Sequence, residues 1–148
     1  MPFRAWNPLA VAVMLFACGG NDGTGPHALT IADLAGNRTV TDWEYSLALD
    51  PSHQVDWVDL GLSGSLTIAP NGDFQVTPML PSGFGVDHGT LSVQGDSIYW
   101  NGENDEEWVH FTLTANTLTL PWPEVEVVDM DGDGQPEDVH LRVVLRRS

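Results

Sequence analysis

The residues with the clearest chemical potential form the segment Asp129-Met130-Asp131-Gly132-Asp133-Gly134-Gln135-Pro136-Glu137. Carboxylates stand at its positions 1, 3 and 5, and the glycine at position 6 permits a turn that brings them together. The carbonyl of Gln135 and the side chain of Glu137 add further oxygen ligands, and hard oxygen donors favour Ca²⁺ over transition metals. The sequence therefore predicts a calcium site, with its ligands at Asp129, Asp131, Asp133, Gln135 and Glu137.

The sequence around this segment distinguishes it from an EF-hand. An EF-hand has a glutamate at position 12 and helices on both sides, whereas this chain has His140 at that place and strand-like sequence on both sides. A structural calcium loop between two strands therefore fits better, and a bound ion would offset the repulsion among the clustered acids. The alternative is an acidic hairpin without an ion, because Asp-Gly turns are common in so acidic a chain.

Other polar clusters give weaker signals. The acidic stretch 103–107 has no supporting glycine spacing and is interpreted as a solvated loop. The five histidines have no close pairing and no spare cysteine, which argues against a zinc site. A hydrolase-like elbow at Gly61-Leu62-Ser63-Gly64 is incomplete, because Ser65 stands where the second glycine belongs. The sequence thus predicts no catalytic residue and a protein that is not an enzyme.

The charge balance limits the partners of this chain. Twenty-one Asp and Glu residues face five arginines, there is no lysine, and the formal net charge is −16. Such a surface repels phosphate backbones, which argues against nucleic-acid binding. It also repels anionic lipid, so any attachment to a membrane must come from acyl chains.

The N-terminal residues have the form of a secretory signal. Arg4 precedes an apolar run over residues 9–17, which is too short to span a bilayer as a helix. The run ends in Leu15-Phe16-Ala17-Cys18, which resembles the lipobox of bacterial lipoproteins. That resemblance implies removal of residues 1–17, acylation of Cys18, and a lipid-anchored place in the cell envelope. Gly19 implies the outer membrane, with the protein facing the periplasm or the exterior. The alternative is an ordinary secretory signal with a chance cysteine.

The rest of the chain consists of a tether over residues 18–28 and one β domain over residues 29–148. Short runs of alternating polarity are separated by turn residues every 8–12 positions, as in Phe74-Gln75-Val76 and Val139-His140-Leu141. Asn71-Gly72 predicts a hairpin turn with positive φ at both residues. Because most connections are hairpin length, the sequence predicts an all-β fold, a single antiparallel up-and-down barrel of about eight strands.

Several of these features resemble the lipocalin-like domains of small bacterial lipoproteins. They are Leu34-Ala35-Gly36 before a long first strand, repeated Leu-Thr-Ile and Leu-Thr-Leu hairpins, and a closing strand rich in Leu, Val and Arg. The resemblance covers residues 29–147. Lipocalins carry Gly-x-Trp at the start of the first strand, and here Arg38 stands in place of the tryptophan.

Two functions remain open. The resemblance implies a non-enzymatic protein that binds a small, largely apolar ligand inside the barrel. In that case Trp57, Phe84 and Trp122 are the predicted contacts, since they fall in loops or strand ends. The alternative is a structural or interaction lipoprotein whose loops contact a protein or glycan. Its barrel would be filled by inward-facing aromatic residues, namely Trp43, Tyr45, Phe74, Trp100 and Phe111. The volume of the interior distinguishes the two.

Overall fold

A computed structural model describes residues 28–80, 83–104 and 106–148. The predicted signal peptide, Cys18 and the tether up to residue 27 lie outside the described residues. One short helix, α1 (Ile31–Leu34), precedes the strands. The strands are β1 (Gly36–Leu47), β2 (Gln54–Asp56), β3 (Ser63–Ile68), β4 (Asp73–Leu80), β5 (Gly83–Phe84), β6 (Asp87–Gln94), β7 (Ser97–Gly102), β8 (Glu106–His110), β9 (Thr112–Leu113), β10 (Thr117–Val128) and β11 (Glu137–Arg147).

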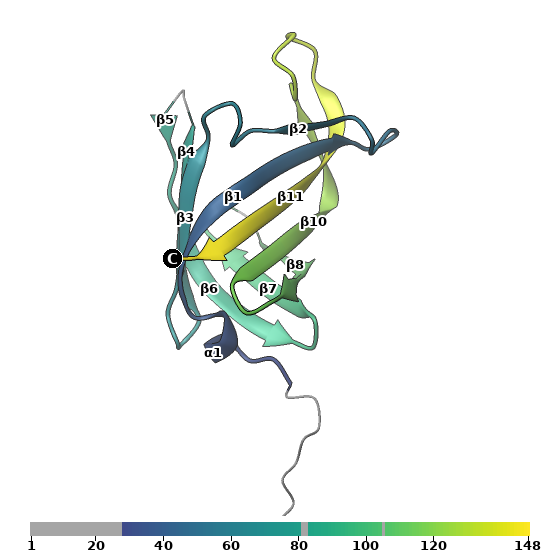
Figure 1. Cartoon of the computed structure of the whole chain (residues 1–148). Helices are drawn as coiled ribbons and strands as arrows, with labels where there is room; N and C mark the ends of the chain where they lie inside the picture. The colour runs from purple at the N-terminus through teal and green to yellow at the C-terminus, as the bar shows by residue number, and fades with distance from the viewer. Residues whose placement is uncertain (1–27, 81–82, 105) are drawn as a thin grey trace, which may run out of the picture.

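The strands form one antiparallel sheet that curls into a nearly closed barrel (Figure 1). Its nine-strand path runs β8-β7-β6-β4-β3-β1-β11-β10-β9, while β2 and β5 pair with β1 and β4. Along this path, strands that follow one another in the sequence lie side by side. The pairing of β1 with β11 and the contacts of β10 with β8 then bring the sheet round into a barrel. The predicted fold class, an all-β antiparallel up-and-down barrel, is confirmed.

The hairpin at Asn71-Gly72 forms where the sequence predicts it, but its backbone differs from the prediction. Gly72 has a φ of +94°, whereas no residue other than glycine has a positive φ among the described residues. The Ala69 amide donates to the Asp73 carbonyl at 2.8 Å, and the Gly72 amide donates to the Ala69 carbonyl at 2.9 Å. Three residues therefore make the turn, with the left-handed conformation at the glycine alone.

One end of the barrel is closed by α1. Leu34 is fully buried, and Arg38, at the start of β1, is only 1% exposed. The Nη2 group of Arg38 donates to the Leu34 carbonyl at 3.2 Å, while its Nε and Nη1 groups make no hydrogen bond with a described residue. Burial and the nearby charge of Arg147 lower the pKa of Arg38. Arg38 and α1 together therefore form the barrel floor, where lipocalins place a tryptophan.

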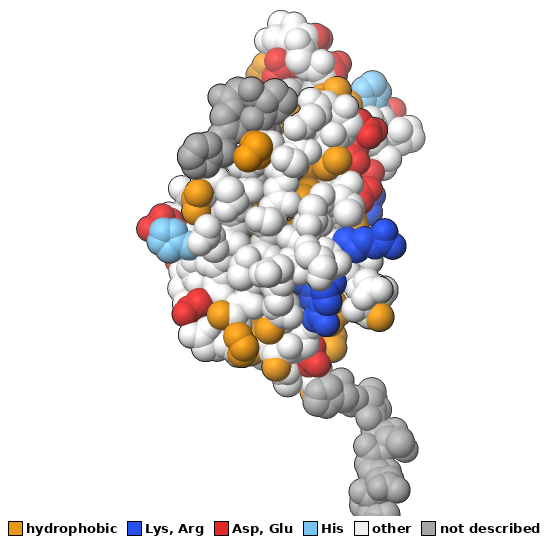
Figure 2. All heavy atoms as spheres, turned by 60° about the vertical axis from the view of Figure 1, so that its left-hand side comes forward, with side chains coloured by type: hydrophobic (Ala, Val, Ile, Leu, Met, Phe, Trp, Pro, Cys, Tyr) orange, Lys and Arg blue, Asp and Glu red, His pale blue; other side chains and the backbone are white. Residues whose placement is uncertain are grey.

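Charge is distributed unevenly over the surface. On the face in Figure 2 the arginine side chains lie together in its right-hand part, while acidic side chains lie toward the edges and the upper end.

One arginine forms an ion pair on the barrel wall. Arg142 in β11 makes two hydrogen bonds with the carboxylate of Glu44 in β1, at 3.1 and 3.0 Å. Since these two residues are also register partners, the ion pair supports the pairing of β1 with β11.

Candidate functional site

A cavity of about 290 Å³ lies inside the barrel and extends to Gly85 and Val86. These two residues follow β5, which lies at the end of the barrel away from α1 (Figure 1). Exposed residues Gly85, Val86 and Asn104 are among those that line it, so it reaches the surface at this end. Its volume lies just below the range of about 300–1,000 Å³ that is usual for ligand pockets. The cavity is therefore large enough for a small molecule.

A bulge in β1 sets which of its side chains face this cavity. Val40 pairs with Leu145, but Asp42 pairs with Val144, so the register shifts between the two positions. The shift changes the phase of the strand. As a result Val40, Trp43 and Tyr45 all line the cavity, opposite Leu145, Val143 and Leu141 of β11.

A second irregularity lies in β10, but it leaves the phase of the strand unchanged. The pairing with β11 is interrupted between Pro121 and Val125, around the sequence Pro121-Trp122-Pro123. Proline has no amide hydrogen to donate to a ladder, so two prolines within three residues favour such a break. Because the register shifts by two residues, Trp122, inside the break, and Glu126, just after it, still face the same side, and both line the cavity.

Four aromatic side chains line the cavity: Trp43, Tyr45, Trp100 and Trp122. The rings of Trp100 and Trp122 meet edge to face with centroids 5.6 Å apart, and Phe74 packs on Trp100 at 4.1 Å. Phe74 is buried and does not line the cavity. The interior is therefore filled around Phe74 and hollow where the four aromatic rings line the cavity.

Polar groups at the cavity are few, and Asp87 is the best connected. Its carboxylate accepts hydrogen bonds from the Trp100 indole at 3.4 Å, the Glu103 amide at 2.9 Å and the Asn104 side chain at 3.3 Å. These bonds tie β6 to the connection between β7 and β8. Asp87 thus places a carboxylate at the rim of the cavity.

Glu126 supplies a second carboxylate, beside the phenol of Tyr45. Burial raises the pKa of Tyr45, and the charge and hydrogen bonding of Glu126 raise it further against a lowering by Trp43. Tyr45 is therefore a neutral hydrogen-bonding group at physiological pH. Its pKa shift reports the anionic neighbour that shares the cavity with it.

The three predicted ligand contacts have different positions. Trp122 lines the cavity. Trp57 packs edge to face on Tyr45 at 5.0 Å and donates its indole hydrogen to the Met130 carbonyl at 3.3 Å, outside the cavity lining. The backbone of Phe84 belongs to β5, and its side chain lies outside the described residues.

Sequence reasoning did not assign Glu126 to a site and interpreted Trp43 and Trp100 as filling residues. The sequence signal for Glu126 was the alternation of β10, since Glu126 shares its phase with the inward-facing Leu120 and Trp122. The bulge in β1 had no such signal, because Thr41 and Asp42 are ordinary residues in a strand.

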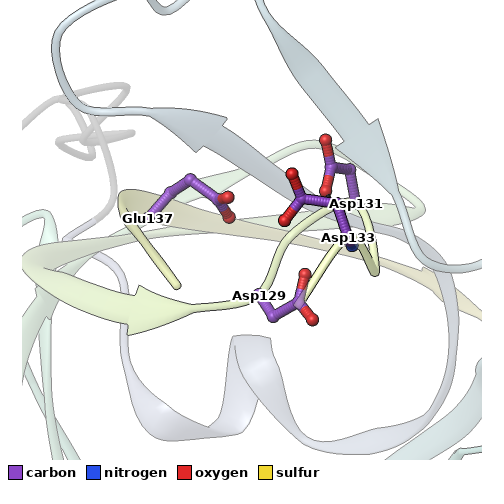
Figure 3. A group of neighbouring side chains, drawn as sticks. All are labelled: Asp129, Asp131, Asp133 and Glu137. Carbon is purple, nitrogen blue, oxygen red and sulfur yellow. Dashed lines mark hydrogen bonds between the residues drawn. The ribbon is translucent and has the colours of Figure 1, made fainter. Parts of the chain in front are cut away.

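The predicted calcium loop connects β10 to β11. One carboxylate oxygen from each of Asp129, Asp131, Asp133 and Glu137 lies within 4.8 Å of the others, and Figure 3 shows the four side chains around a common space. Within the described ranges these residues form the one group of carboxylates and imidazoles that could hold a metal ion. The strands on both sides agree with the prediction and with the exclusion of an EF-hand.

Hydrogen bonds give the loop its shape. The Gly132 and Gly134 amides donate to the two carboxylate oxygens of Asp129 at 2.8 and 3.0 Å, and both glycines have positive φ. The Gln135 amide donates to Asp133 at 2.7 Å. Met130 is buried in the core, and its amide donates to Glu137 at 2.9 Å. The acidic groups are thus held on a loop that is fixed to the barrel.

None of the histidines in the described ranges belongs to a group of side chains that could hold a metal ion. The Nε2 atom of His88 lies 3.2 Å from Oε1 of Glu103, and the Nδ1 atom of His110 lies 3.5 Å from Oδ1 of Asp96. Both pairs are exposed.

Among the described residues, no helix is long and apolar enough to cross a membrane. Comparisons of the chain with protein-family models, with curated proteins and with solved structures found no match.

Proposed function

We propose that this protein is a non-enzymatic, lipid-anchored envelope protein whose barrel binds a small, largely apolar molecule. The observation that carries this proposal is the open cavity of about 290 Å³, whose lining is mostly aliphatic and aromatic. Binding pockets for small molecules are typically concave and apolar with a few polar groups, and this cavity has that composition. The nine-strand path is one strand longer than the eight at which a barrel becomes just wide enough to hold one such ligand.

The position of the first described residues, relative to the cavity opening, also suits the proposed lipid anchor. The described chain begins beside α1, at the floor of the barrel (Figure 1). The cavity reaches exposed residues that follow β5, toward the other end. With Cys18 acylated and residues 18–28 as a tether, the floor would face the membrane. The cavity would then open toward the aqueous compartment, where a ligand arrives.

Mass spectrometry of the protein purified from its own envelope tests both parts of the proposal. The denatured mature chain should begin at Cys18 and carry the added mass of acyl chains. Under native conditions a further mass of a small molecule should appear and be lost on unfolding. An unmodified mature chain would contradict the anchor, and a folded barrel with no bound molecule would contradict the ligand.

A structural or interaction role is the second candidate, and one observation favours it. Trp108 of β8 and Val125 and Val127 of β10 are exposed, on strands that lie side by side. Exposed apolar side chains on adjoining strands are typical of surfaces that meet a partner. A ligand-free barrel in the native spectrum, together with a co-purifying protein or glycan, would favour this role.

We also propose that the loop over Asp129, Asp131, Asp133 and Glu137 binds Ca²⁺ with a structural role, with the Gln135 carbonyl as a further ligand. The support is the mutual approach of the four side chains on a loop whose amides already fix Asp129 and Asp133. Because position 12 is His140 rather than a bidentate glutamate, the Kd should be weak, about 10⁻⁴–10⁻³ M.

Millimolar Ca²⁺ should therefore raise the melting temperature. An ion that binds only the folded state at a few millimolar stabilises it by roughly 1–2 kcal/mol if the Kd lies in this range. Mg²⁺ should have less effect, because it dehydrates reluctantly and demands stricter geometry. Thermal unfolding with each ion at equal ionic strength measures the difference.

Two matched variants complete this test. Asp131→Ala removes one proposed ligand and should abolish the calcium-dependent rise. Asp138→Ala removes the same side chain from an exposed residue of β11 outside the loop and should preserve the rise. Equal stabilisation by Mg²⁺, or an unchanged calcium response in Asp131→Ala, would show that the loop is only an acidic turn.

A further inference from the structure

We infer that the molecule bound in the barrel is an organic cation, a small quaternary or protonated amine with an apolar body. This inference rests on the proposed ligand-binding function and names the chemical class of the ligand. Four aromatic rings and two carboxylates line one cavity, and none of its described lining residues is basic.

The aromatic part of the wall favours a positive charge. The faces of Trp and Tyr rings carry negative electrostatic potential and attract a cation within about 6 Å of the ring centroid. Trp100 and Trp122 both line the cavity and stand edge to face with centroids 5.6 Å apart, so their ring planes are steeply inclined to each other. Trp43 and Tyr45 add rings from β1. Several rings around one space form the kind of cage that recognises quaternary ammonium groups.

The carboxylates of the cavity also favour a positively charged ligand. Glu126 is close enough to Tyr45 for its charge to raise the pKa of the phenol, and Asp87 lies at the rim. Two carboxylates with no basic group in the same cavity repel an anionic ligand and attract a cation. The formal net charge of −16 would also draw cations toward the protein from solution.

The same wall does not suit a metal ion. Ca²⁺ takes about 6–8 oxygen ligands, and the cavity has few oxygen-bearing side chains among mostly aliphatic and aromatic ones. A ligand that combines a positive charge with hydrocarbon satisfies both the carboxylates and the apolar wall. An organic ammonium ion therefore fits better than a neutral hydrocarbon, a fatty acid or a metal ion.

Three probes of similar size test the inference: 3-hydroxyphenyltrimethylammonium, its neutral carbon analogue 3-tert-butylphenol, and the anion 3-hydroxybenzoate. Each is titrated by calorimetry into the full chain after any co-purified ligand has been removed by unfolding and refolding. The cation should bind about tenfold or more tighter than the neutral analogue, because cation–π attraction strengthens when the charge is desolvated. The anion should bind most weakly.

Two pairs of variants locate the effect. Glu126→Gln keeps the size of the side chain and should remove most of the preference for the cation, whereas Glu124→Gln loses the same charge from an exposed residue outside the barrel cavity and should keep it. Trp122→Leu should weaken binding of the cation, whereas Trp108→Leu, at a residue that does not line the cavity, should leave the affinity unchanged. Far-UV circular dichroism confirms that each variant is folded.

The possible outcomes distinguish an error in the class of ligand from an error in the proposed ligand-binding function. Equal or tighter binding of 3-tert-butylphenol or 3-hydroxybenzoate would overturn the cationic class while supporting a ligand-binding barrel. An unchanged preference in Glu126→Gln would overturn the role of that carboxylate. If none of the three probes binds and native mass spectra show an empty barrel, the proposed function itself fails.

Discussion

Replacing Trp100 by alanine is expected to lower the free energy of unfolding by about 3–5 kcal/mol, the usual cost of truncating a buried tryptophan. Trp100 is 4% exposed, and its ring packs on Phe74 and Trp122. Its indole also donates to Asp87, which holds the connection between β7 and β8. The substitution therefore removes packing and a hydrogen bond and enlarges an existing cavity. Urea unfolding followed by circular dichroism measures the loss.

Trp108 is the matched control for this substitution. It is 48% exposed and contacts Tyr99 with ring centroids 5.2 Å apart. Trp108→Ala should lower the free energy of unfolding by only about 0.5–1.5 kcal/mol, the contribution of one aromatic pair. A similar loss of unfolding free energy in the two variants would contradict the buried position of Trp100, between Phe74 and the cavity.

The second large effect is expected at Gly89, in β6. Gly89 pairs with Gly102 of β7, and a Cβ atom at Gly89 would overlap the Asn101 carbonyl oxygen. It would also lie 2.8 Å from the Asn101 carbonyl carbon and from the Gly102 Cα atom. These are backbone atoms, which cannot rotate away as the end of a side chain can. Gly89→Ala should therefore destabilise the protein by about 1–3 kcal/mol or more, as overpacking does.

Gly85→Ala is the control for this steric argument. A Cβ at Gly85 would meet only the Pro78 side chain, at 4.0 Å, and its φ is not in the left-handed region. Such a change should be neutral or should stabilise the fold by about 0.4–1 kcal/mol through the unfolded chain. Thermal unfolding of both variants measures the contrast. If Gly89→Ala melts within a degree of the parent protein, the close approach of β6 and β7 is not as described.

The alternation of polar and apolar residues was sufficient to predict the barrel. Side chains in a strand alternate between two faces, so Phe74-Gln75-Val76 or Val139-His140-Leu141 can bury one face only as strands. Short turns then leave few ways to connect them other than side by side. The metal loop could also be predicted, because its ligands come from one continuous segment whose turn geometry depends on nearby glycines. The sequence by itself therefore determined the fold class and the candidate metal residues.

Only the tertiary structure decided where the barrel is hollow. The shift near Asp42 in β1 and the break at Pro121-Trp122-Pro123 in β10 depend on how each strand pairs with β11, and pairing is not a local property. Whether Trp57 faces the cavity or packs on Tyr45 depends on β2 in the same way. Glu126 joins four aromatic rings only after strands distant in sequence meet. A cavity is the space that many side chains leave between them, so no single segment of sequence can specify it.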